Sequence, residues 1–318
     1  MSKNEIQLRH KKSSSNKLLY LSMLSLVFIA TSAIALNSDL ENVITYIYPE
    51  KNTKDYSDLP VLAEDAKYPI LSSQSVMAVD LTSGVTLYEK DPNKALLPAS
   101  TTKILTALVA IDTYTAEQVL KVGKISVVGQ KMGLVWGEEM KFIDLLNGLL
   151  IYSANDAAEI LAQNHPGGRA LFIGLMNKKV KDLGLTNSHF TNPVGLDDGA
   201  QYSTARDLVI VAKYAMQNPT FAEIVGTKEK IVKSTDGKIS HKLVNINKLL
   251  GVVPGVLGVK TGWTENAREN LVTAVDRDGR KIMIVVLGSS DRFGETKELI
   301  EWIYSNYKWE EVTPRSNL

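Results

Sequence analysis

The order of the predicted secondary-structure elements constrains the fold most strongly. Residues 75–91 form two strand-like segments around the turn dipeptide Ser83-Gly84, which predicts an antiparallel hairpin. The middle of the chain has apolar residues at helical spacing. Strand patterns return over 228–290, with a second hairpin turn at Asp278-Gly279, and a last helix is expected over 296–309. This order predicts an α+β fold: an antiparallel sheet from both chain ends, flanked by helices, with an inserted and mostly helical lobe.

An uncharged segment precedes these elements. Leu18 to Leu36 contains no charged residue, and as a helix it would be about 28 Å long, close to the ~30 Å hydrocarbon core of a membrane. Residues 1–17 carry an excess of Lys and Arg, which favours an N-terminus inside the cell and a body outside. The favoured interpretation is a retained transmembrane anchor in the cell membrane. Ala33-Ile34-Ala35 leaves a cleaved signal peptide, and hence a secreted or periplasmic protein, as the alternative.

Composition and pattern together predict five regions. The segment after the uncharged run is polar and contains several prolines without any sustained periodicity, as expected of a stalk. The predicted regions are a cytoplasmic basic tail (1–17), a transmembrane anchor or signal peptide (18–36), an extracytoplasmic stalk (37–69), a folded domain (70–310) and a C-terminal tail (311–318).

The residue types exclude several kinds of site. The chain has no cysteine, which rules out disulfides, thiolate zinc sites and a cysteine nucleophile. Its 36 basic and 35 acidic residues nearly balance, which argues against nucleic-acid binding. None of the four histidines lies in a nucleophile elbow or an HExxH pattern, so neither a serine–histidine–acid triad nor a zinc site is expected. We therefore expect no metal or cofactor, and a hydrolase with this sequence would use lysine as its base.

The pattern Ser-x-x-Lys occurs three times, at Ser14, Ser100 and Ser305, and only Ser100 has a chemical setting. It lies at a predicted helix start, where Lys103 one turn later can reach its hydroxyl and unpaired backbone N–H groups could hold an oxyanion. Burial beside apolar neighbours, or a second cation, would lower the pKa of Lys103 toward that of a general base. The alternative is a capping serine followed by a solvated lysine.

Two further motifs follow Ser100 along the chain. Ser153-Ala154-Asn155 comes after an apolar helix, and Lys260-Thr261-Gly262 lies in a strand-like stretch. Separately they could be a helix break and an exposed strand with a turn. In this order, the three motifs are the signature of penicillin-binding proteins and class A β-lactamases.

The sequence resembles the serine-type D-alanyl-D-alanine carboxypeptidases, which are low-molecular-mass penicillin-binding proteins with the β-lactamase/transpeptidase-like fold. The similarity extends from about residue 75 to residue 307. It includes the segments PASTTKILTAL, SANDAAEILA, HFTNPVGLDD, YSTARDL and VKTGWTENARENLV.

The resemblance implies a mechanism. Ser100 would attack the carbonyl between the two terminal D-alanines of a peptidoglycan stem peptide, and Lys103 would take the serine proton. Ser153, hydrogen-bonded with Lys260, would pass a proton to the leaving D-alanine. The backbone N–H groups of Ser100 and Trp263 would form the oxyanion hole. Water would then hydrolyse the acyl-enzyme, whereas β-lactam antibiotics would acylate the same serine and leave slowly.

The resemblance also implies how the substrate is held. Asn155 would bind the substrate amide and help to orient Lys103. Thr261 and Arg292 would bind the terminal carboxylate, a role suited to a guanidinium fork. Gly262, which lacks a Cβ, would let the substrate backbone approach the strand.

Three other functions are compatible with this fold. A β-lactamase commonly carries a deacylating glutamate in a Glu-x-x-Leu-Asn loop, and none of the glutamates between the second and third motifs is followed by that pattern. A catalytically silent wall-binding protein is expected to have lost a motif residue, and all are present. D,D-endopeptidase or transpeptidase activity stays open, because acceptor choice depends on cleft shape. Gln201 and Ala267-Arg268-Glu269 depart from the family pattern and bear on substrate preference.

Overall fold

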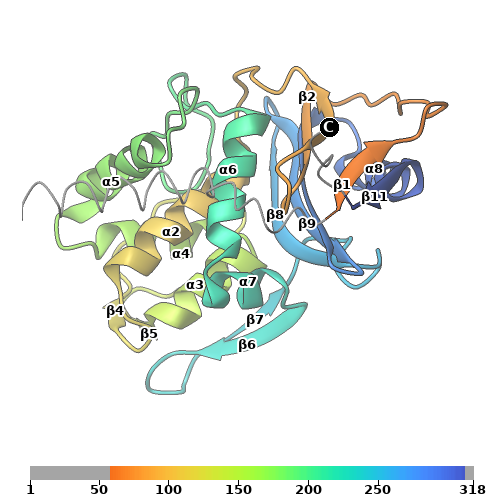
Figure 1. Cartoon of the computed structure of the whole chain (residues 1–318). Coiled ribbons are helices and arrows are strands. Elements are labelled where there is room, and N and C mark those ends of the chain that lie inside the picture. The colour runs from red at the N-terminus through yellow and green to blue at the C-terminus, as the bar shows by residue number, and fades with distance from the viewer. Residues whose placement is uncertain (1–57, 312–318) are drawn as a thin grey trace, which may run out of the picture. The chain divides into compact units, whose positions relative to one another are not determined.

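The computed structural model describes residues 58–311 (Figure 1). The predicted basic tail, the uncharged segment 18–36 and the first part of the stalk lie outside the described residues, as do 312–318. Within 58–311, no helix is both long enough and apolar enough to cross a membrane.

The centre of the domain is a five-stranded antiparallel sheet (Figure 1). Its strand order is β3 (Thr86–Lys90), β2 (Ser75–Asp80), β10 (Arg280–Ser289), β9 (Arg268–Arg277) and β8 (Val256–Thr264). β2 pairs directly with β10, so the early hairpin and the late strands share one sheet. This arrangement confirms the predicted α+β fold.

The sheet is buried on both faces because β10 alternates two sets of apolar side chains. Met283, Val285 and Leu287 pack into the core beneath the helical lobe. Ile282, Ile284 and Val286 face a second core, formed largely with the closing helix. Successive residues of a strand point to opposite faces, so this fully apolar strand belongs at the sheet centre.

Helices cover both faces of the sheet (Figure 1). The lobe on one side comprises α2 (Lys103–Thr113), α3 (Phe142–Ile151), α4 (Asn155–Gln163), α5 (Gly168–Asp182), α6 (Ala205–Met216) and α7 (Pro219–Val225). The 3₁₀ turn η1 (Ala99–Thr102) leads into α2, and α8 (Arg292–Asn306) lies against the other face. Two small two-stranded sheets complete the lobe: β4 (Val119–Lys121) with β5 (Glu139–Lys141), and β6 (Glu229–Lys233) with β7 (Ser240–Val244).

Two predicted boundaries differ from the structure: the start of the domain and the extent of its closing helix. β1 (Leu59–Leu62) lies inside the segment predicted as a stalk and pairs with β11 (Tyr307–Glu310). The folded domain therefore starts by Leu59, before the predicted 70, and the closing helix runs over 292–306, earlier than the expected 296–309. Sequence periodicity missed β1 because a four-residue strand with a proline is specified by its partner more than by its own pattern.

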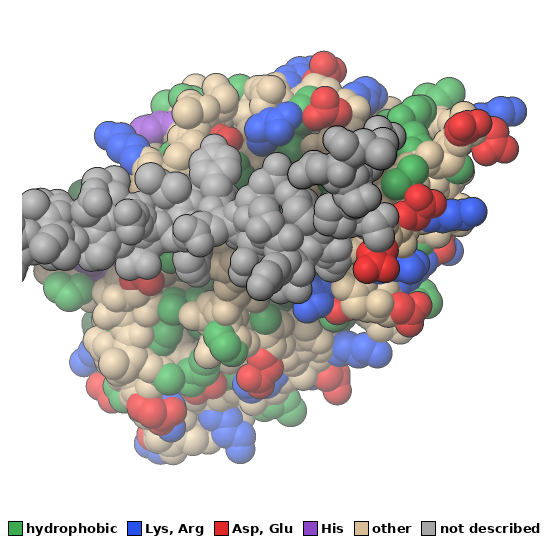
Figure 2. Space-filling model, viewed as in Figure 1, with side chains coloured by type: hydrophobic (Ala, Val, Ile, Leu, Met, Phe, Trp, Pro, Cys, Tyr) green, Lys and Arg blue, Asp and Glu red, His purple; other side chains and the backbone are tan. Residues whose placement is uncertain are grey.

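Surface charges are mixed on the face of the molecule that Figure 2 shows. Basic and acidic side chains are interspersed there, in keeping with the near-balance of 36 and 35 charged residues over the whole sequence. Where the described side chains are visible on this face, they form no continuous basic stripe of the kind that binds nucleic-acid phosphates.

Candidate active site

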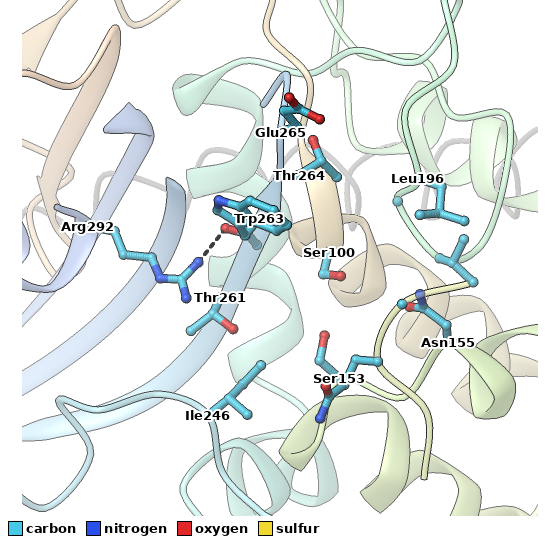
Figure 3. A pocket seen from close by; sticks show the side chains of 15 residues that line it. Ser100, Ser153, Asn155, Leu196, Ile246, Thr261, Trp263, Thr264, Glu265 and Arg292 are labelled. Atoms are coloured by element: carbon cyan, nitrogen blue, oxygen red, sulfur yellow. Dashed lines mark hydrogen bonds between the residues drawn. The ribbon is translucent and has the colours of Figure 1, made fainter. Parts of the chain in front are cut away.

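The fold brings the three motifs together around one pocket of about 570 Å³ (Figure 3). Ser100 comes from η1, Ser153 from the turn between α3 and α4, and Thr261 from the edge strand β8. The other predicted residues that line the pocket are Asn155, Gly262, Trp263 and Arg292. Lys103 and Lys260 are buried behind its surface.

The Lys103 amine lies against the Ser100 hydroxyl. Lys103 Nζ donates a hydrogen bond to Ser100 Oγ at 2.9 Å and another to the carbonyl of Val194. The side chain is fully buried, and this burial lowers the pKa of Lys103 from 10.5 to about 7, against the opposing charges of Asp156 and Glu159. An amine with this pKa is available in its neutral form at physiological pH, as a general base must be.

A second buried lysine holds Ser153. Lys260 Nζ donates to Ser153 Oγ at 2.8 Å and to the carbonyl of Thr261 at 3.0 Å. Burial lowers the pKa of Lys260 well below its ordinary value, and the charges of Lys103 and Arg292 lower it further. Ser153 has a left-handed φ of 59°, a conformation that only a small fraction of non-glycine residues adopt.

Gly262 is explained by a contact inside the protein. A Cβ at this position would lie 3.0 Å from the Pro98 carbonyl oxygen and 3.1 Å from the backbone nitrogen of Ser100. The missing side chain therefore lets β8 lie directly against the turn that carries Ser100. The resemblance implies that Gly262 makes room for the substrate; in the structure the groups closest to it belong to Pro98 and to η1.

Gly195 is a site residue that the sequence reasoning missed. Asn192 Oδ1 accepts hydrogen bonds from the backbone N–H groups of Val194, Gly195 and Leu196 and so shapes this loop. Gly195 has φ +87°, and a Cβ there would lie 1.9 Å from the Ala99 carbonyl oxygen. The loop thus packs against the turn that carries Ser100, and its Val194 carbonyl accepts a hydrogen bond from the Lys103 amine. The Asn-Pro-Val-Gly run was the available signal, since Asn and Gly favour such turns.

We expect Gly195→Ala to destabilise the protein by about 2–5 kcal/mol, because it combines an unfavourable φ with a backbone clash. The displaced Ser100 turn should also lose most of its reactivity. Gly199→Ala in the same region is the matched control, because a Cβ there meets nothing within 4 Å and its φ is not left-handed. Denaturant unfolding of both variants measures the difference, and equal stability would contradict the proposed support.

The contacts of Asn155 differ from those predicted. Its Nδ2 donates to the Val128 carbonyl at 2.7 Å, and among residues 58–311 its Oδ1 has no partner although it is buried. The structure contains no hydrogen bond between Asn155 and Lys103, so the expected orientation of Lys103 by Asn155 is wrong; the Val194 carbonyl makes that contact instead. A buried carbonyl oxygen without a partner is costly, and a substrate N–H would satisfy it.

The loop that contacts Asn155 is anchored at two points. The Asp156 carboxylate accepts hydrogen bonds from the backbone N–H groups of Met132, Gly133 and Leu134. Further along, Glu138 Oε1 lies 2.7 Å from Nε2 of the buried His241. These contacts fix the wall of the pocket opposite β8.

Arg292 supplies a cation at one end of the pocket (Figure 3). Its Nη1 donates to the Gly262 carbonyl at 2.7 Å, and its buried Nε has no partner among the described residues. Burial lowers the pKa of Arg292, opposed by the charge of Glu269, but a guanidinium stays protonated. The residues 58–311 contain no group of three or more His, Asp or Glu side chains able to hold a metal ion.

Comparison with known proteins identifies the family. Residues 63–291 match the model of the D-alanyl-D-alanine carboxypeptidase family, peptidase family S11. The chain is 37% identical over 244 residues to D-alanyl-D-alanine carboxypeptidase DacB2 of Mycobacterium tuberculosis, covering 72% of this chain and 81% of that protein. It is 33% identical over 246 residues to DacF of Bacillus subtilis, covering 74% of this chain and 63% of that protein.

A solved structure agrees with the sequence relatives. The crystal structure of the Streptomyces K15 DD-transpeptidase matches with a TM-score of 0.72 and 31% identity, over 76% of this chain and 100% of that one. The fold, the order of the motifs and their convergence on one pocket are thus accounted for together, and the chain belongs to the peptidase S11 family of serine-type D-alanyl-D-alanine carboxypeptidases.

Proposed function

We propose that this protein is a penicillin-sensitive D,D-carboxypeptidase that removes the terminal D-alanine from peptidoglycan stem peptides through an acyl-enzyme on Ser100. One observation carries the proposal. A serine hydroxyl lines the pocket 2.9 Å from a fully buried amine whose pKa is about 7. This pairing activates an alcohol without histidine or metal.

In the acylation step, the neutral Lys103 amine takes the Ser100 proton while Oγ attacks the carbonyl carbon of the penultimate D-alanine. The backbone N–H groups of Ser100 and Trp263 would stabilise the oxyanion, and the contact of Gly262 with the Ser100 turn keeps the two backbones close. The C–N bond then breaks as the leaving D-alanine nitrogen receives a proton through Ser153, which is bonded to Lys260. Water then attacks the ester and gives one proton to the Ser153–Lys260 pair, which replaces the proton that went to D-alanine, while Lys103 returns its proton to the Ser100 oxygen.

Arg292 and Thr261 are the proposed binding groups for the terminal carboxylate. We expect Arg292→Ala to lower kcat/KM for substrates with a free C-terminal carboxylate by about 10–100-fold, the loss typical of a charge-assisted hydrogen bond. C-terminally amidated substrates should be affected much less. Arg280→Ala, an exposed arginine outside the pocket, is the control. Equal loss on both substrate types would remove the carboxylate role.

Product analysis on a defined pentapeptide ending in D-Ala-D-Ala tests the proposal directly. Free D-alanine with no cross-linked product supports carboxypeptidase activity, and a fluorescent penicillin should label the protein covalently. Transpeptidase activity is the second candidate, because the Streptomyces K15 relative is named both a carboxypeptidase and a DD-transpeptidase. Cross-linked dimers or release of D-alanine only with an acceptor amine would favour it, and cleavage of cross-linked peptides would favour an endopeptidase.

A β-lactamase has less support. Glu159, buried next to the second motif, is bound bidentately by Arg169 at 2.8 and 3.0 Å and does not line the pocket. Rapid turnover of nitrocefin without a lasting adduct would reverse this ranking.

We also propose that the domain works outside the cytoplasmic membrane, attached through segment 18–36. The support is the uncharged length of that segment, the basic residues before it and a substrate that lies in the cell wall. Fractionation of cells followed by protease treatment of spheroplasts tests this. Recovery of the intact chain in the cytosol would contradict it.

A further inference from the structure

His241 is a buried side chain that the proposed mechanism does not use. It lies on β7, whose residues alternate between exposed and buried, and it is on the buried face together with Leu243. Only 4% of the His241 side chain is exposed, and the side chain of Glu138 beside it is completely buried. Burying a polar ring without hydrogen bonds is unfavourable, so the partners of its two nitrogens indicate its role.

Both ring nitrogens contact the loop that forms one wall of the pocket, called here the wall loop (residues 128–138). Nδ1 of His241 lies 3.0 Å from the Met132 carbonyl oxygen, and since a carbonyl oxygen can only accept, Nδ1 donates. Nε2 lies 2.7 Å from Oε1 of Glu138, whose Oε2 accepts from the backbone N–H of Val135 at 2.9 Å. The ring therefore joins β7 to two points of the wall loop.

Met132 is held by a second anchor as well. Its backbone N–H donates to Asp156 Oδ1 at 3.0 Å, while its carbonyl accepts from His241. Asp156 directly follows Asn155 at the start of α4. One polar group of the Met132 backbone is thus bound from α4 and the other from β7, so a displacement of the loop at this point breaks at least one of the two hydrogen bonds.

The wall loop also binds Asn155 itself. The Gln130 carbonyl accepts from the Asn155 backbone N–H at 2.8 Å, and the Val128 carbonyl accepts from Asn155 Nδ2 at 2.7 Å. Gly129 between them has φ +82°, and a Cβ there would lie 2.9 Å from Asn155 Nδ2. This close fit directs Nδ2 into the loop. It leaves Oδ1, which has no partner within the described part of the chain, for a ligand in the pocket.

We propose that His241 is a positioning residue that holds the wall loop at Met132 and thereby fixes the orientation of Asn155. The contacts run from β7 through the Met132 carbonyl and the loop backbone to the Asn155 side chain. Figure 3 shows Asn155 on the side of the pocket that lies opposite Thr261. The inference rests on the proposed function, because it takes Asn155 as a contact of the stem peptide. It adds a side chain that acts on substrate binding without lining the pocket.

Two variants of His241 separate this role from a general contribution to stability. Both remove the contact with Glu138. Asparagine can place its Nδ2 where Nδ1 was and donate to the Met132 carbonyl, whereas leucine cannot. In the full-length chain purified in detergent, we expect His241→Leu to lower kcat/KM for D-alanine release from the defined pentapeptide by about three- to tenfold, the effect of one hydrogen bond. His241→Asn should stay within about twofold of the wild-type value.

A double-mutant cycle identifies the residue through which His241 acts. In a protein that already carries Asn155→Ala, His241→Leu should lower kcat/KM by less than about twofold, because no Asn155 side chain is left to orient. General damage to the fold would instead add to the effect of Asn155→Ala. Thermal unfolding checks that each variant is folded at the assay temperature. If His241→Leu is not, His241→Gln takes its place, because its longer amide can reach Glu138 and not Met132, and it should show the same loss.

The rate constant for acylation by fluorescent penicillin is measured on the same variants. The inference is overturned if the leucine variant is as active as the wild-type protein, if His241→Asn loses as much as His241→Leu, or if the effects of His241→Leu and Asn155→Ala add. Absence of D-alanine release by the wild-type protein would instead contradict the proposed function, and the acylation rates would then decide the role of His241.

Discussion

Ser100→Ala is expected to abolish covalent labelling by fluorescent penicillin and to lower D-alanine release by on the order of 10⁴-fold or more. The reason is that no other pocket hydroxyl has the same setting. Ser153 Oγ accepts from Lys260, whereas Ser100 Oγ faces the amine of Lys103, whose pKa is about 7. Gel fluorescence after incubation with the labelled penicillin measures acylation, and mass spectrometry of the digested adduct locates it.

The chain offers its own control for this variant. Ser305 and Lys308 repeat the Ser-x-x-Lys spacing, but both are exposed and divided between the end of α8 and β11. The Ser305→Ala variant should be labelled by fluorescent penicillin to the same extent as the wild-type protein. Undiminished labelling of Ser100→Ala, with unchanged thermal unfolding, would show that another residue is acylated.

Lys103→Met is expected to slow acylation by about 10²–10⁴-fold while leaving a folded protein. Methionine fills the buried space with an unbranched apolar side chain but cannot accept the Ser100 proton. The second-order rate constant for acylation by penicillin measures the effect, and circular dichroism checks the fold. A folded variant that acylates at the wild-type rate would exclude Lys103 as the base.

The pH dependence of the wild-type protein is part of the same prediction. Only the neutral Lys103 amine can take a proton, so the acylation rate should fall about tenfold per pH unit below a pKa of about 7 and level off above it. A rate that is flat between pH 5 and 7, on the order of the plateau value, would contradict this assignment.

The stability of the fold should respond to pH with a definite sign. The folded-state pKa of Lys103, about 7, lies below the ordinary 10.5, so the unfolded chain binds more protons between these values. The unfolding free energy therefore rises with pH across that window, and Lys260, also lowered, contributes in the same direction. Lys103→Met should reduce this slope, which urea unfolding at a series of pH values measures.

Short-range patterns carried much of the prediction. The Ser100–Lys103 contact follows from the three-residue spacing at a helix start. Residues three apart on a helix are neighbours, so the Lys103 amine can reach the Ser100 hydroxyl whatever fold the rest of the chain adopts. The hairpins at Ser83-Gly84 and Asp278-Gly279 and the apolar run of β10 are local in the same sense. These features were readable because backbone geometry relates residues a few positions apart directly.

Contacts between residues far apart in the sequence could not be predicted from these local patterns. The family resemblance linked Ser153 to Lys260, but their 2.8 Å bond spans 107 positions and follows from packing of the lobe on the sheet edge. Three other contacts also depend on which surfaces pack against each other in the folded chain. They are the contact of Gly195 with Ala99, the hydrogen bond of Asn155 to Val128 and the pairing of β1 with β11. Periodicity shows that a face is apolar without specifying its partner.

The sequence by itself determined the strands of the central sheet, the chemical identity of the site and the family. Tertiary structure alone decided how the chemistry is tuned: burial lowers the pKa of Lys103, the Val194 carbonyl orients its amine, and the packing of the lobe against β8 brings the Lys260 amine to the Ser153 hydroxyl. The physical reason is that the free energy of a charged group depends on the solvent and charges around it, and in a folded chain those surroundings come from residues remote in sequence.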